Sequence, residues 1–447
     1  MAKHLTDRRS FIKTSAGLAA GTLLLPSISR AQGANNRVVV GMVGVGGRGR
    51  FLVDRLCERD DVDIAWVCDP DSRRWGGSLD AVEKARGMRP KTTHDLREML
   101  DDSEVDAIVV ATPDHWHALP TILGCQAGKD VYVEKPASHN VNEGRKMIEA
   151  AEKYGSIVQL GTQNRSAPYV QDAVEYIRDG NIGDVHYARV LNMKTRGTIG
   201  HKEDSAPPAE VDYDTWLGPA PDRPFNENRF HYAWHWYWDY SGGDIINDGV
   251  HQIDVARWLI GKKAPSSVVC TGGTLFFEDD QETPDTQAAQ FDFGDLIMSF
   301  ELTLWTPYMK KTPWDFRDTD GVPDWRFSAT RIEIYGTKGI MFMSRHGGGA
   351  QVFDPDGKVV AEFPGRHPHN PHIENFLDCV RTRKAPNAPI DEGHYSTNLC
   401  HLANISLRMG GRRLEWDGEE EQFIGDAAAN KLLKRRGRKP WIIPDEV

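Results

Sequence analysis

Three glycines and one aspartate near the start of the chain have the spacing of a dinucleotide-binding turn. Residues 38–43 form an apolar run, and Gly44, Gly46 and Gly49 follow it as G-x-G-x-x-G. In this pattern the first glycine permits a tight turn, the second lets the backbone approach a pyrophosphate, and the third lets the next helix pack closely. The phosphates then lie at a helix N-terminus, which favours anions. Asp69 ends a second apolar segment 25 positions after Gly44, close to the interval at which a carboxylate binds the ribose hydroxyls.

The carboxylate of Asp69 favours NAD over NADP as the cofactor, because its charge would repel a 2′-phosphate. Arg73 and Arg74 follow closely and could soften this preference. We therefore expect NAD, with NADP as the alternative.

The first thirty residues have the pattern of an export signal. The pair Arg8-Arg9 begins a twin-arginine motif, and an apolar stretch follows at about residues 16–25. Small residues up to Ala31 provide a cleavage site. We expect the twin-arginine translocation machinery to recognise residues 1–31 and the mature protein to be periplasmic or otherwise exported. This route carries folded proteins, so it suits a protein that binds its nucleotide in the cytosol.

Length and charge limit the remaining function classes. About 415 residues follow the signal, enough for two domains. The net charge of −11 argues against nucleic acid as a partner. The basic run at residues 431–439 is isolated and carries no aromatic residue, so we expect a solvated tail there.

Short apolar strands and helical stretches alternate in the first part of the mature chain. Such βαβ alternation predicts a doubly wound parallel sheet, a Rossmann domain, over residues 35–160. The expected strands are 38–43, 63–68, 106–111, 130–133 and 156–160, and the expected helices are 48–58, 78–86, 95–101, 117–127 and 141–154.

After residue 160 the pattern changes. Consecutive long strands without intervening helices predict an α+β domain over residues 161–447, with an open, largely antiparallel sheet. The expected strands are 185–193, 267–277, 287–293, 296–305, 330–335 and 340–344, and the expected helices are 169–179, 249–260, 372–380 and 396–409.

Two further motifs lie outside the glycine turn. Glu134-Lys135-Pro136 ends one predicted strand, and residues 241–254 open a predicted helix with Gly249, His251 and Asp254. Together with the glycine turn and the segment 111–117, these motifs resemble those of the Gfo/Idh/MocA oxidoreductase family. The resemblance extends over nearly the whole mature chain. Glucose–fructose oxidoreductases and inositol 2-dehydrogenases are familiar members, and some members are NAD-dependent glycoside hydrolases.

The resemblance implies that Lys135 projects toward the reacting carbon and that His251 handles the substrate proton. Oxidation of an alcohol needs a base for the hydroxyl proton, and histidine has a suitable pKa. A lysine beside it can hold the developing alkoxide. The familiar dehydrogenases carry an aspartate four positions before the histidine, where this chain has Asn247, followed by Asp248. Asparagine accepts no proton but can orient a hydroxyl, so Asn247 is a third catalytic candidate.

The resemblance also implies further contacts with the cofactor and the substrate. Gln163 and Asn164 follow a predicted strand, and the carboxyl ends of parallel strands line the ligand crevice of such sheets. We expect Gln163 to contact the cofactor and Asn164 the substrate. The other cofactor contacts carried over are Thr112, Pro113, His117 and Glu134.

The segment 229–240 is rich in aromatic rings and contains two histidines. Such rings can form a platform for sugars, with Trp236 and Tyr240 as the expected contacts and with Asp248 and Asp254 taking hydroxyl groups. An aromatic core or a subunit interface is the alternative. The histidines of residues 367–372 are separated by prolines and do not have the spacing of a metal site, so we expect a polar loop and no metal.

These patterns leave three hypotheses. The first is an exported NAD(P)-dependent oxidoreductase for a sugar, sugar derivative or polyol. The second is an NAD-dependent glycoside hydrolase that oxidises C3 transiently. The third is a sugar-binding protein of the same fold without turnover, supported only by Asn247. The open sheet of this family commonly pairs face to face, which predicts a homo-oligomer, either a dimer or a tetramer.

Overall fold

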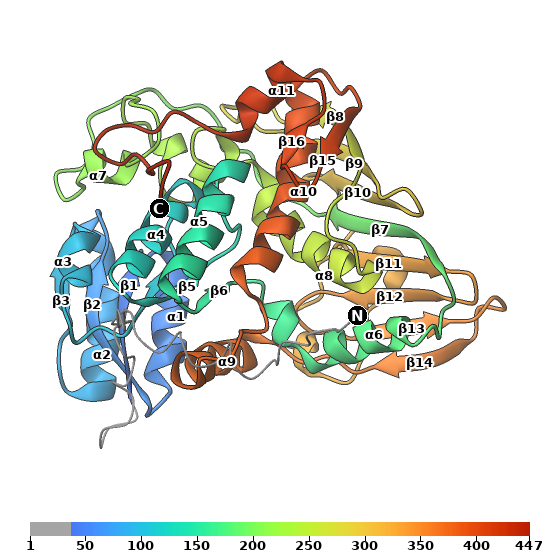
Figure 1. Cartoon of the computed structure of the whole chain (residues 1–447), viewed down its shortest axis with the longest axis horizontal. Coiled ribbons are helices and arrows are strands. Elements are labelled where there is room, and N and C mark those ends of the chain that lie inside the picture. Colours follow the sequence, from blue (N-terminus) through green and yellow to red (C-terminus); the bar gives the residue numbers. More distant parts are fainter. Residues whose placement is uncertain (1–36) are drawn as a thin grey trace, which may run out of the picture. The chain divides into compact units, whose positions relative to one another are not determined.

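Two β-sheets organise the part of the chain that the structure, a computed structural model, describes, residues 37–447 (Figure 1). The predicted signal at residues 1–31 lies outside the described residues. No helix within residues 37–447 is long and apolar enough to cross a membrane.

The first sheet is parallel throughout and has the strand order β3-β2-β1-β4-β5-β6. This order confirms the predicted Rossmann domain. The strands up to β3 are added on one side of β1 and the strands from β4 on the other, and such folds bind ligands at this switch point between β1 and β4. The strands are β1 (Val38–Val43), β2 (Val62–Cys68), β3 (Lys91–Thr93), β4 (Ala107–Val110), β5 (Asp130–Val133) and β6 (Val158–Leu160). The sequence analysis missed β3, because Lys-Thr-Thr carries no apolar run.

Helices cover both faces of the first sheet (Figure 1). One face packs against α3 (Leu96–Leu100), α4 (Ala118–Gln126) and α5 (Val141–Tyr154), and the other against α1 (Gly47–Cys57), α2 (Trp75–Arg86) and α9 (His369–Thr382). Phe376 and Leu377 of α9 are buried against this sheet. The second half of the chain therefore completes the Rossmann core.

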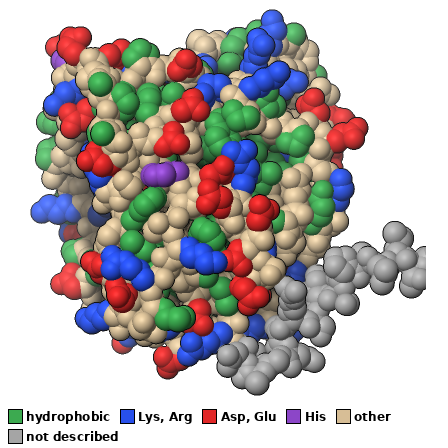
Figure 2. All heavy atoms as spheres, turned by 90° about the vertical axis from the view of Figure 1, so that its left-hand side faces the viewer, with side chains coloured by type: hydrophobic (Ala, Val, Ile, Leu, Met, Phe, Trp, Pro, Cys, Tyr) green, Lys and Arg blue, Asp and Glu red, His purple; other side chains and the backbone are tan. Residues whose placement is uncertain are grey.

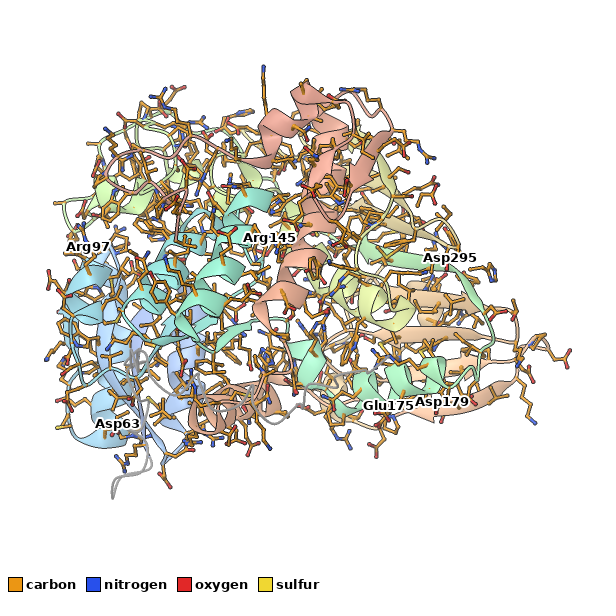
Figure 3. The ribbon with its side chains drawn as sticks, in the orientation of Figure 1. Asp63, Arg97, Arg145, Glu175, Asp179 and Asp295 are labelled. Atoms are coloured by element: carbon orange, nitrogen blue, oxygen red, sulfur yellow. The ribbon has the colours of Figure 1, made fainter. Side chains whose placement is uncertain are left out.

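The prediction of a solvated C-terminal tail is wrong. Trp441 is buried and packs edge-on against Trp116, with 5.2 Å between the ring centroids. Arg97, labelled in Figure 3, lies over the same indole. Arg435 pairs with Glu143 of α5 at 2.6 Å. These partners lie hundreds of residues away in the sequence, so the basic run alone gave no sign of them.

The second sheet has ten strands and is antiparallel except between β7 and β10. This confirms the predicted open, largely antiparallel sheet. Its order is β14-β13-β12-β11-β7-β10-β9-β8-β15-β16. The strands are β7 (Val185–Met193), β8 (Ser267–Gly273), β9 (Thr286–Asp292), β10 (Ile297–Thr303), β11 (Arg331–Gly336), β12 (Ile340–Ser344), β13 (Ala350–Phe353), β14 (Val359–Phe363), β15 (Leu414–Asp417) and β16 (Gln422–Phe423).

Three helices pack their apolar side chains with those of the second sheet: α6 (Pro168–Arg178), α8 (Val250–Ile260) and α10 (Ile390–Arg408). The remaining helices, α7 (Tyr213–Leu217) and α11 (Ala427–Asn430), are short. Arg145 of α5, labelled in Figure 3, pairs with Glu421 beside β16 at 2.7 Å and so ties the Rossmann helices to this second layer. On the face shown in Figure 2, acidic and basic side chains are interspersed.

Candidate active site

A cavity of about 720 Å³ lies at the carboxyl ends of β1, β2 and β4. It brings together the predicted cofactor residues and the predicted catalytic residues, which come from both halves of the chain. From the predicted set, its lining contains Gly44, Gly46, Asp69, Thr112, Pro113, Glu134, Lys135, Gln163, Asn247, Asp248 and His251.

The glycine turn has the geometry that a bound pyrophosphate requires. Gly44 has φ +83°, and a Cβ there would lie 2.8 Å from the carbonyl oxygen of Ala111. A Cβ on Gly49 would lie 2.0 Å from the carbonyl oxygen of Gly44, so Gly49 serves close packing and does not line the cavity. Gly46 lines the cavity at the start of α1, with no atom within 4 Å of the position of a Cβ. The space in front of this helix N-terminus therefore fits a dinucleotide.

Asp69 lies at the end of β2 on the same side of the cavity. Its carboxylate accepts hydrogen bonds from the backbone N–H groups of Val45 at 2.8 Å and Asp71 at 2.9 Å. Burial raises the pKa of Asp69 to about 6, so the group is mostly ionised at neutral pH and can accept ribose hydroxyls. Arg74 also lines the cavity. Its positive charge could pair with a 2′-phosphate and so weaken the preference for NAD over NADP.

Lys135 follows β5 and reaches across to the turn before α8. Its Nζ donates to the backbone oxygen of Asn247 at 2.7 Å and to the side-chain Oδ1 at 3.3 Å. Asn247 lies in a π-helical turn, Ile245–Gly249, and its Nδ2 donates to Asp244 at 3.1 Å. The ammonium group is thus held by two neutral oxygens where the familiar dehydrogenases carry a carboxylate.

His251 is buried, 5 % exposed, and lines the same cavity. Its Nδ1 has no hydrogen-bond partner among residues 37–447. Burial, together with the charges of Arg345 and Lys135, lowers the pKa of His251 well below its ordinary value. The imidazole is therefore neutral at neutral pH, the form in which a ring nitrogen offers its lone pair to a substrate hydroxyl.

Two carboxylates beside this pair, the buried Asp244 and the half-buried Asp248, form an ionic network. Asp244 pairs with Lys194 at 2.6 Å and with Arg196 at 2.9 Å. Asp248 pairs with Lys311 at 2.7 Å and with Arg345 at 3.0 Å, and it also contacts Lys194. Burial favours the protonated acids, but these cations outweigh it and lower the pKa of both carboxyls. Asp248 is consequently an ion-paired anion beside the site.

The sequence analysis missed the cations of this network. Burial lowers the pKa of Lys194 to about 8, so this lysine is an unusual group that a site prediction should include. Its only signal in the sequence is its position directly after a predicted strand. Lys194 and Arg196 follow β7, Arg345 follows β12, and Lys311 lies in the loop between β10 and β11. Only the fold brings these three segments together.

The prediction of Trp236 and Tyr240 as substrate contacts is wrong. Both side chains are buried in the core of the second layer and neither lines the cavity. The segment His231–Trp236 is a 3-10 helix, in which residues three apart share a face. Residues 231, 232, 234 and 235 line the cavity, whereas 233 and 236 lie on the remaining face.

Asp254 is also not a substrate contact. Its side chain is fully buried and pairs with Arg165 at 2.8 Å, while Ser396 of α10 donates to it at 2.6 Å. Asp254 is directed by these contacts toward Arg165 and α10, and it does not line the cavity.

Asn164 and His117 support the site from outside the cavity lining. The Oδ1 of Asn164 accepts from the backbone N–H of His346 at 2.8 Å. The His117 ring lies between the carbonyl oxygens of Pro136 at 2.6 Å and Thr112 at 3.0 Å. Both residues position loops that line the cavity.

The polar loop predicted around residues 367–372 is instead partly helical, because α9 begins at His369. His369 and His346 line the cavity. Within residues 37–447, no group of three or more histidine, cysteine or acidic side chains is arranged to hold a metal ion.

Comparison with known proteins agrees with this architecture. A model of an oxidoreductase family with an NAD-binding Rossmann fold matches residues 38–162, and the model of that family's C-terminal alpha/beta domain matches residues 193–280 and 333–443. Both models belong to the Gfo/Idh/MocA group.

Individual relatives are distant. A glycosyl hydrolase family 109 protein of Stenotrophomonas maltophilia is 30% identical over 48% of this chain, and the match spans about half of that relative, 47%. A scyllo-inositol 2-dehydrogenase (NAD(+)) of Bacillus subtilis is 25% identical over 77% of this chain and 86% of its own length.

A solved structure shows the same fold. The WlbA dehydrogenase of Bordetella pertussis, in complex with NADH and UDP-GlcNAcA, superposes with a TM-score of 0.61 at 23% identity, over 85% of this chain and 99% of that one. The glycine turn, the cavity and both domain matches lead to one assignment. This chain belongs to the Gfo/Idh/MocA oxidoreductase family, with an NAD-binding Rossmann domain as its first layer.

Proposed function

We propose that this protein is an exported NAD-dependent oxidoreductase that acts on a hydroxyl group of a sugar, a sugar derivative or a polyol. The observation that carries the proposal is the shared cavity, which joins Gly46 and Asp69 to Lys135 and His251. The match with the inositol dehydrogenase over most of both chains supports a polyhydroxylated substrate.

The residues around the cavity suit alcohol oxidation. When bound, the nicotinamide supplies the acceptor for the hydride that leaves the substrate carbon. His251 lines the cavity and is neutral, so its imidazole can take the hydroxyl proton. The Lys135 ammonium, fixed by the two oxygens of Asn247, can donate a hydrogen bond to the alkoxide oxygen as it forms. Proton acceptance and charge stabilisation are thus divided between two residues.

A second candidate is hydrolysis of a glycoside through transient oxidation. The 30% identity to the family 109 glycosyl hydrolase supports it. The neutral Asn247 also fits it, because this chain departs there from the familiar dehydrogenases. The two candidates differ in whether one turnover leaves a net change in the redox state of the nucleotide.

Incubation with free sugars and polyols and, separately, with aryl glycosides separates the two candidates. Absorbance at 340 nm and release of the aglycone are followed together. We expect a free sugar or polyol to reduce the bound nucleotide stoichiometrically, and a second carbonyl compound to reoxidise it. Release of aglycone over many turnovers, without net change at 340 nm, would instead favour the hydrolase.

Export and self-association are further parts of the proposal. Arg8-Arg9 and the apolar stretch after it support export by the twin-arginine route. Replacement of both arginines by lysine should leave the protein in the cytoplasm on cell fractionation, and unchanged export would contradict this route. The open second sheet, which in this family commonly pairs face to face, supports self-association. Light scattering should give a dimer or a tetramer, and a monomer would contradict this part.

A further inference from the structure

His235 is a cavity-lining histidine that has no part in the proton and charge transfers proposed above. It lies in the 3-10 helix His231–Trp236 and lines the cavity together with Lys135 and His251. The residue is buried, 7 % exposed. Its neighbour Trp236 is buried in the core of the second layer, whereas His235 borders the space that a substrate would occupy.

The main chain holds His235 beside the catalytic lysine. The backbone N–H of Gly243 donates to the carbonyl oxygen of His235 at 3.0 Å, and the carbonyl oxygen of Gly243 accepts from the backbone N–H of Asn247 at 3.0 Å. Asn247 in turn accepts two hydrogen bonds from Lys135. The same turn therefore positions His235 and the ammonium group.

The His235 ring has a defined orientation and a defined tautomer. It stacks on Trp234 with 3.6 Å between the ring centroids. Its Nδ1 lies 2.5 Å from the carbonyl oxygen of Tyr232, and because a carbonyl oxygen can only accept, Nδ1 carries the hydrogen. Burial, and then the charge of Lys135, lowers the pKa of His235 to about 3. The ring is thus neutral at neutral pH, and Nε2 carries a lone pair.

Nε2 of His235 is an acceptor without a donor. It has no hydrogen-bond partner among residues 37–447, yet it is not one of the unpaired side-chain atoms that are closed off from solvent. It therefore faces open space, and the space that His235 lines is the cavity. A ligand hydroxyl would satisfy this nitrogen. A carbonyl, ether or carboxylate oxygen would instead set one lone pair against another.

We propose that His235 accepts a hydrogen bond from the substrate hydroxyl next to the one that is oxidised, so that the substrate is a vicinal diol. This inference rests on the proposed function, because Lys135 marks the position of the reacting oxygen. The charge of Lys135 lowers the pKa of both His251 and His235, so both rings lie near one ammonium group. With the reacting hydroxyl between Lys135 and His251, the hydroxyl on the next carbon is the nearest group that can donate to Nε2.

Calorimetric titration of the full-length, NAD-loaded protein tests this contact without requiring turnover. Glucose, galactose and myo-inositol are the parent probes, and the complete set of monodeoxy analogues of the tightest binder is titrated beside it. We expect removal of one hydroxyl to weaken binding about tenfold or more, the scale of a buried acceptor left unpaired. This hydroxyl should be adjacent to the one whose removal abolishes reduction of NAD at 340 nm. Analogues that all bind as tightly as the parent would overturn the contact.

Variants assign the loss to His235. His235→Phe keeps a planar ring for stacking on Trp234 but removes the acceptor, so it should bind the parent about tenfold more weakly and the critical analogue as before. His235→Gln can present an oxygen near the position of Nε2 and should retain part of the preference. His186→Phe, at an exposed position of β7 outside the cavity, should retain all of it. A preference that is undiminished in His235→Phe would overturn the proposal.

Failure of the contact and failure of the oxidoreductase give different results. A parent that reduces the nucleotide, but whose preference over its analogues does not depend on His235, would sink the contact and keep the oxidoreductase. A parent that binds through His235 without reducing the nucleotide would do the reverse.

Discussion

Replacement of Lys135 by methionine should lower kcat by about 10²-fold or more, the usual scale for a positioned group that acts on a developing charge. Methionine keeps most of the length of the side chain but removes the ammonium group that Asn247 holds at 2.7 Å. The affinity for NAD should stay nearly unchanged, because Gly46 and Asp69 bind the other end of the cofactor.

Steady-state kinetics on the best substrate of the panel, with a separate NAD titration, measures both effects. Lys358→Met changes an exposed lysine in the turn before β14 and serves as the control. If Lys135→Met turns over at the wild-type rate, Lys135 does not contact the reacting oxygen.

Replacement of Asp254 by alanine should destabilise the fold by about 3–5 kcal/mol, the cost of removing one partner from a buried ion pair. The guanidinium of Arg165 is 3 % exposed and would keep only Glu392, whose carboxylate lies at 3.1 Å and also pairs with Arg257. The KM of the surviving folded protein should not change, because Asp254 lies outside the cavity.

Chemical denaturation and kinetics of the same preparation separate the two roles of Asp254. Asp295→Ala removes an exposed carboxylate, labelled in Figure 3, that pairs with Lys262 at the surface, and should change the stability little. Wild-type stability of Asp254→Ala, combined with a raised KM, would restore Asp254 as a substrate contact.

The sequence predicted those elements whose signals are local. Helix α5 has the predicted bounds, because Asn140 caps its first turn and Gly155 ends it with φ 64°. Strand β7 also has its predicted bounds as a long run between turns. Strands β13 and β14 were missed, since their short segments flank Asp-Pro-Asp-Gly and carry many polar residues. β13 and β14 pair antiparallel across this turn, so Asp-Pro-Asp-Gly was a local hairpin signal that the apolar pattern did not reveal.

The same distinction holds for the site. Lys135, Asn247 and His251 belong to continuous motifs, and the fold brings them into one cavity. His346, which lines the cavity, was missed because it is a single residue in a loop, and only the glycine run after it marked that loop. Trp236 was assigned to the wrong face of its segment. An aromatic-rich sequence does not show which rings a 3-10 turn places in the cavity and which it buries in the core.

Nucleotide binding by wild-type protein and by Gly46→Leu tests the central claim most directly. A Cβ at Gly46 would meet no protein atom within 4 Å, and Gly46 lines the cavity, so leucine there should exclude the dinucleotide without unfolding the chain. Gly76→Leu, at an equally open position on α2 outside the cavity, is the control. We expect one NAD per chain in wild type and in the control, and none in Gly46→Leu. Wild-type protein that carries no nucleotide and binds neither NAD nor NADP on titration would contradict the account.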